Sequence, residues 1–132
     1  MSEKAAKVIE TERFVLRDSQ GRVRAELGEG TQHAVALKPF DEHQRCRVEV
    51  VVAADGTAGI QFWDEGGLPR VILALDPDKP YIAAPSLSLT GRDGQSGVVL
   101  SVAPDGTPSI SFLKDGAPFC ELPGQEEKPS EE

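Results

Sequence analysis

The stretch VEVVVAADGTAGIQFWDEG, residues 48–66, returns fifty residues later as VVLSVAPDGTPSISFLKDG, residues 98–116. The two segments align without a gap, and nine of the nineteen positions are identical. Average residue frequencies would give roughly one identity. A repeat of this kind indicates a chain assembled from copies of one small structural unit.

The repeated unit has the pattern of a β-hairpin. Apolar residues alternate through residues 48–52, which is the period typical of a strand. Asp55 and Gly56 then predict a tight turn, because Asp bonds its own backbone and Gly accepts a positive φ. A second strand follows through residues 60–63, and residues 70–75 return. The residues expected to face the core are Val48, Val50, Val52, Ile60, Phe62, Val71, Leu73 and Leu75.

A diverged copy of the unit opens the protein. It contains Asp18, Gly21 and the run Arg24-Ala25-Glu26-Leu27. This pattern resembles a DxxGxxRAxL repeat that recurs in uncharacterised bacterial proteins, and it returns in part over residues 64–73, where Val71 replaces the Ala. The resemblance implies a β-repeat fold and a bacterial source, and it implies no activity.

The pattern predicts an all-β fold of antiparallel hairpins. A meander, a β-solenoid and a prism-like barrel all fit, and the sequence leaves the three open. We expect one domain over residues 1–124 and a disordered acidic tail over residues 125–132. The expected hairpins span about residues 11–30, 31–56, 57–78, 79–106 and 107–124.

Charge and composition exclude several classes of partner. The net charge is −8, and residues 51–132 supply all of it. Such a chain lacks the basic surface that nucleic acid or an anionic membrane requires, and no apolar run is long enough for a membrane span. Two cysteines do not make a disulfide framework, so we expect a cytoplasmic protein.

The first hairpin is locally basic. Alternation places Arg13, Arg17, Arg22 and Arg24 on one face of it. This face is either solvated, with Glu26 as a partial partner, or it docks an acidic surface such as that of another subunit.

No residue set predicts catalysis, a cofactor or a metal. The glycine-rich run over residues 91–97 lies between two expected strands, whereas a dinucleotide loop needs a helix after it, so we interpret the run as a hairpin loop. The soft metal ligands are only His33, His43, Cys46 and Cys120, and their spacing does not suit a closed zinc site. We therefore expect a protein that is not an enzyme.

Apolar residues also occur on the strand face that should be wet. Strands that are apolar on both faces belong to a layered or assembled sheet. The leading hypothesis is a structural or protein-interaction module that forms a homo-oligomer. A module that binds a small molecule or saccharide with its hairpin loops is the alternative, and a hydrolytic enzyme without an identifiable site is third. The expected oligomer interface consists of Val15, Val51, Trp63, Ile72, Val99 and Leu113.

Overall fold

The computed structural model describes residues 8–75 and 85–124, which form ten β-strands and one short 3₁₀ turn at Thr31–His33. The acidic tail expected over residues 125–132 lies outside these residues. The strands are β1 (Arg13–Arg17), β2 (Val23–Glu29), β3 (Val35–Pro39), β4 (Val48–Val52), β5 (Ala58–Trp63), β6 (Pro69–Leu75), β7 (Ser86–Thr90), β8 (Gly97–Val102), β9 (Pro108–Lys114) and β10 (Ala117–Leu122).

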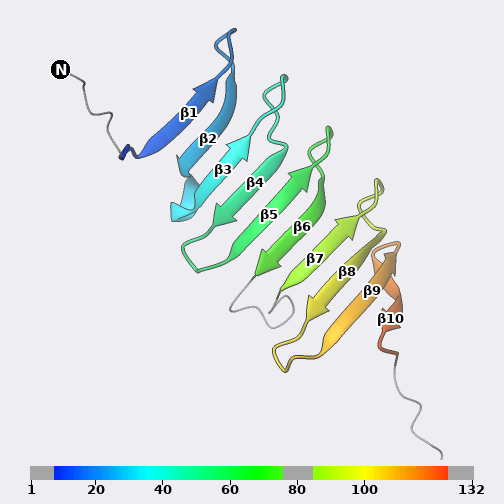
Figure 1. Cartoon of the computed structure of the whole chain (residues 1–132). Coiled ribbons are helices and arrows are strands. Elements are labelled where there is room, and N and C mark those ends of the chain that lie inside the picture. The colour runs from blue at the N-terminus through cyan, green and yellow to red at the C-terminus, as the bar shows by residue number, and fades with distance from the viewer. Residues whose placement is uncertain (1–7, 76–84, 125–132) are drawn as a thin grey trace, which may run out of the picture.

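All ten strands belong to one antiparallel sheet, in the order in which they occur along the chain (Figure 1). The all-β prediction is confirmed, and of the three architectures the structure shows the meander. The sheet is open, with β1 at one edge and β10 at the other. The axes of strands β1 to β9 lie nearly parallel in Figure 1, and successive strands point in opposite directions. A flat sheet of so many strands is unusual and is typically stabilised by stacking.

The tight turns follow the sequence prediction. Gly56 and Gly106 have matching φ values of +88° and +86°, a region that L side chains rarely adopt. The backbone N–H of Thr57 donates to the Asp55 carboxylate at 2.9 Å, and that of Thr107 donates to Asp105 at the same distance. The Asp-Gly pair therefore specifies both turns.

At the other end of the hairpins, the turns reveal a repeat of 23 residues. The segments DSQGRVR, residues 18–24, and DEHQRCR, residues 41–47, form the same turn. In each, the first Asp accepts hydrogen bonds from the backbone and the guanidinium of the Arg four residues later. A third such Asp, Asp64, caps the turn between β5 and β6. The offset of fifty residues between the two repeated segments, which begin in β4 and β8, therefore spans two hairpins.

The strand registers define two faces, because residues directly opposite one another point to the same side of a sheet. The apolar face carries a central row with one residue from each strand, a second row on one side of it, and a third row on the other side that includes Val35, Val52, Leu75 and Val102. The central row is Phe14, Leu27, Leu37, Val50, Ile60, Leu73, Leu87, Leu100, Ile110 and Leu122, and the second row is Leu16, Ala25, Pro39, Val48, Phe62, Val71, Leu89, Val98, Phe112 and Cys120.

The residues expected to form the core are not buried, which corrects the sequence analysis. Among the described residues, Ala36 is the single buried hydrophobic residue, at 6% exposure, and no side chain is completely buried. Leu73 is 48% exposed and Val52 is 54% exposed. The described part of the chain forms one layer, so it holds no second layer to cover these residues.

Candidate functional site: an exposed apolar face

The apolar face exposes a large, continuous area of apolar surface. Fourteen of its large side chains are between 37% and 54% exposed. Together they expose on the order of 1,000 Å² of apolar surface, against roughly 300–600 Å² for the largest patch on a typical monomer. These residues are Phe14, Leu16, Leu27, Val35, Leu37, Val50, Val52, Phe62, Leu73, Leu75, Leu89, Leu100, Val102 and Leu122.

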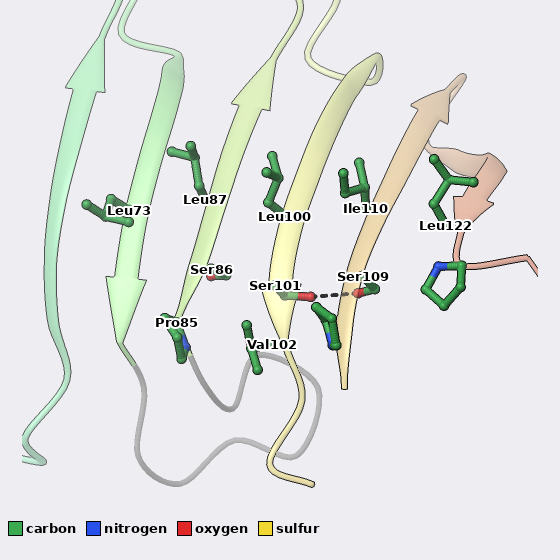
Figure 2. A pocket seen from close by; sticks show the side chains of 12 residues that line it. Leu73, Pro85, Ser86, Leu87, Leu100, Ser101, Val102, Ser109, Ile110 and Leu122 are labelled. Carbon is green, nitrogen blue, oxygen red and sulfur yellow. Dashed lines mark hydrogen bonds between the residues drawn. The ribbon is translucent and has the colours of Figure 1, made fainter. Parts of the chain in front are cut away.

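The apolar face is hollowed at its C-terminal end. A hollow of about 660 Å³ extends from Leu73 on β6 to Leu122 on β10. Figure 2 shows the large side chains of five successive strands along it, with Leu87, Leu100 and Ile110 in the middle. Its walls are almost entirely apolar, so they offer contact area for hydrocarbon and few polar groups to a ligand.

The opposite face is built from smaller side chains. One row across the sheet consists of Gly28, Ala36, Val51, Gly59, Ala74, Ser86, Ser101 and Ser109. Ser86 is 8% exposed, and the hydroxyls of Ser101 and Ser109 are 3.1 Å apart (Figure 2). Short side chains leave little surface for water, so this face is partly buried without a second layer.

The predicted interface residues lie on this opposite face. Val15, Ile72 and Val99 belong to one row with Glu26, Lys38, Gln61, Ser88, Ser111 and Glu121. Val51 pairs with Ala36, and Leu113 pairs with Gly97. Trp63 lies next to the bulge that Arg70 forms in β6, and it lines one hollow with Lys38 and Glu49, which form an ion pair. All six residues are half-buried, whereas the apolar face is exposed.

A series of arginines joins consecutive hairpins at the turn end of the sheet. Arg24 Nε donates to the Phe40 carbonyl at 3.2 Å, and Arg47 Nε donates to the Trp63 carbonyl at 2.9 Å. Arg70 Nε repeats the contact on the Thr90 carbonyl at 2.5 Å. Gly97 and Phe119 occupy the corresponding position in the last two hairpins, so the series ends after the third hairpin.

The four arginines of the predicted basic face have partners within the chain. Arg13 lies 2.5 Å from Glu26, and Arg22 lies 2.8 Å from Asp18. Arg24 lies 3.6 Å from the same Asp18 carboxylate, and Arg17 donates to the Gly21 carbonyl at 2.8 Å. These contacts hold the first turn together, and docking of an acidic surface stays a hypothesis.

The turn carboxylates have lowered pKa values. For Asp41, burial acts to raise the pKa, but hydrogen bonds from the backbone and side chain of Arg45 outweigh it and lower the pKa to about 2. The hydroxyl and backbone N–H of Ser96 lower the pKa of Asp93 to about 2 as well. Both groups are therefore charged at neutral pH and act as turn caps.

The other candidate residues are separated. His33 contacts Glu29, and His43 lies beside Glu42. Cys46 is half-buried near Lys38, and burial raises the pKa of its thiol. Within residues 8–75 and 85–124, no group of three or more His, Cys, Asp or Glu side chains could hold a metal. The glycine-rich run over residues 91–97 joins two strands, as expected.

The comparisons with known proteins place no family on this chain. No protein-family model matches the sequence, and a search of curated proteins finds no relative. The resemblance to DxxGxxRAxL repeats stays a hypothesis. Among the described residues, the structure contains no helix with the length and apolar character needed to cross a membrane.

Proposed function

We propose that the protein is a structural module that self-associates through its apolar face. One observation carries the proposal: a ten-stranded sheet has one face of large apolar side chains and, among its described residues, one buried hydrophobic residue. Burying on the order of 1,000 Å² per copy would contribute about 25 kcal/mol before the entropic costs of folding and association.

A second copy of the same chain is the proposed occupant of this face. Two flat sheets of equal length can stack face to face with their apolar rows interdigitated, as in a β-sandwich. Each copy then meets a face that is apolar along its whole length, as the ten-residue central row requires. Folding and association would be coupled, because a single copy lacks a core.

Adjacent residues in β7 provide a matched test. Leu89 is 42% exposed on the apolar face, whereas Ser88 is half-buried on the opposite face. We expect light scattering to give an oligomeric mass for the wild type and for Ser88→Asp, and loss of the oligomer for Leu89→Asp. A folded wild-type monomer, or equal losses in the two variants, would contradict the proposal.

A hollow on the opposite face favours the small-molecule alternative. It measures about 730 Å³ and is lined by Trp63, Phe40 and the Lys38–Glu49 pair, next to the turn over residues 64–67. The indole N–H of Trp63 is buried and has no hydrogen-bond partner among the described residues, and an aromatic ring beside polar groups suits a saccharide. Trp63 is the only tryptophan, so its fluorescence would report a bound sugar selected on a glycan array. No binding anywhere on the array would remove this alternative.

A further inference from the structure

The sheet ends in two edge strands, β1 and β10, each of which pairs with only one other strand of the described chain. Exposed sheet edges present unpaired N–H and C=O groups and invite further pairing. We propose that β10 of one copy pairs with β1 of the next copy, so that the assembly closes into a ring without free edges. This inference rests on the proposed self-association and names how the copies join.

Strand direction favours this junction. All nine strand pairs are antiparallel, so β1 and β10 run in opposite directions in a sheet of ten strands. A symmetry axis parallel to the strands preserves their direction. A β10–β1 junction between copies is then antiparallel as well, and the alternation of closely and widely spaced hydrogen-bonded pairs continues through it.

The side-chain rows also continue through the junction. Leu122 is the last residue of the central row and Phe14 is the first, so pairing them extends the row from one copy into the next. The same register places Cys120 opposite Leu16 in the second row. A shift by one residue would move apolar side chains to the other face, so the proposed register is the one that keeps the apolar face continuous.

Charge on the opposite face agrees with this register. Glu121 then lies opposite Val15 of the next copy, with Arg13 as its diagonal neighbour. Diagonal neighbours on one face are within reach of long side chains. The Arg13 side chain is 59% exposed and bonds Glu26 from one side, so it can also donate a hydrogen bond to a second carboxylate. Part of the basic first hairpin thus meets an acidic residue of another subunit.

The last strand, β10, has an irregular register and a short free edge. In Figure 1, β10 follows β9 at the edge of the sheet, and the register of the pair shifts between Pro118 and Cys120. Leu122 of this last strand forms part of the wall of the hollow in the apolar face. Pro118 and Pro123 flank the free segment, and neither can donate a hydrogen bond, so the junction is confined to about three residues.

Cross-linking through the native Cys120 tests the junction. In a Cys46→Ser background, Leu16→Cys places a thiol opposite Cys120 of the next copy. The two edges of one chain are roughly 40 Å apart at about 4.8 Å per strand, so a disulfide must join two copies. We expect oxidised glutathione to convert most of the chain to a covalent oligomer on a non-reducing gel. Leu37→Cys, on β3 of the same face, is the matched control and should not cross-link to Cys120.

A second cysteine pair avoids the apolar face. Val15→Cys with Glu121→Cys, in a chain also carrying Cys46→Ser and Cys120→Ser, should cross-link in the same register. Light scattering of each variant before oxidation separates the two proposals. An assembled protein in which neither pair cross-links would overturn the edge junction and leave the self-association intact. A ladder of products beyond the light-scattering mass would overturn the closure, and a folded wild-type monomer would overturn both.

Discussion

The two faces of the sheet differ in where their contacts are made. Much of the opposite face consists of short side chains and of ion pairs within the same chain, such as Lys38 with Glu49 at 3.0 Å, and its larger residues, such as Ile72, are half-buried. The apolar face consists of large side chains, such as Leu73, that remain half-exposed. A single chain therefore covers much of one face and leaves the other exposed, and our proposal is that a second copy covers it. Changes on the opposite face should alter stability alone, whereas changes on the apolar face should alter assembly.

The strongest contrast is expected at adjacent residues of β6. Leu73→Ser removes a side chain from the centre of the proposed interface, and it should lower the free energy of unfolding by about 2–4 kcal/mol per copy and dissociate the oligomer. Ile72→Ser, on the half-buried opposite face, should cost about 1 kcal/mol and leave the oligomeric mass unchanged. Thermal melts and light scattering measure both. Dissociation by Ile72→Ser alone would move the interface to the opposite face.

A smaller effect is expected where glycine lets strands approach. A Cβ on Gly97 would lie 2.3 Å from the Leu89 carbonyl oxygen, closer than real Cβ contacts allow, whereas one on Gly59 would lie 3.0 Å from the Leu73 carbonyl oxygen. Gly97→Ala should therefore destabilise by about 2 kcal/mol or more, and Gly59→Ala by less. Chemical denaturation ranks them. A larger loss of stability for Gly59→Ala than for Gly97→Ala would show that the close approach of Gly97 to the Leu89 carbonyl does not determine the cost.

The arginine series should contribute less again. Arg47→Met keeps most of the aliphatic stem but removes the hydrogen bond to the Trp63 carbonyl, so it should cost about 1 kcal/mol without changing the mass. Arg92→Met is the control, because Arg92 is exposed in the turn between β7 and β8. Equal melting temperatures for both variants would show that the Arg47 hydrogen bond does not stabilise the fold.

Acid should weaken the turns before it affects the apolar face. The pKa of Asp41 is about 2 in the folded chain and near 3.8 otherwise, so the unfolded chain binds the proton more readily. Stability should therefore be complete above about pH 4 and fall as the pH drops toward 2. Asp41→Asn should melt lower at pH 7 and show a shallower dependence between pH 4 and pH 2. A wild-type melting temperature that is constant over this window would contradict the assignment.

The sequence predicts the two faces but not which face is covered. Alternation along residues 48–52 separates the side chains into two sets, and the structure separates them in the same way. Alternation within one chain carries no information about what covers either face. The described residues form one layer, so the interior that the alternation predicts is absent from them.

One repeat was missed for a local reason. Glycines such as Gly21 and Gly67 are the residues that mark hairpin turns in the sequence. In the turn after β3 the corresponding residue is Gln44, which adopts a φ of +63° without being glycine. The spacing of Asp41, Arg45 and Arg47, identical to that in the first hairpin, is the signal that identifies this turn.

The most direct test of the central claim is the mass of the wild-type chain in solution, measured by sedimentation equilibrium over a wide concentration range. The chain mass is 14.1 kDa. The account predicts a whole multiple of this mass at all concentrations at which the protein is folded, with dissociation accompanied by loss of strand structure. A folded protein of 14.1 kDa at high concentration would contradict it, because the apolar face would then stand open to water.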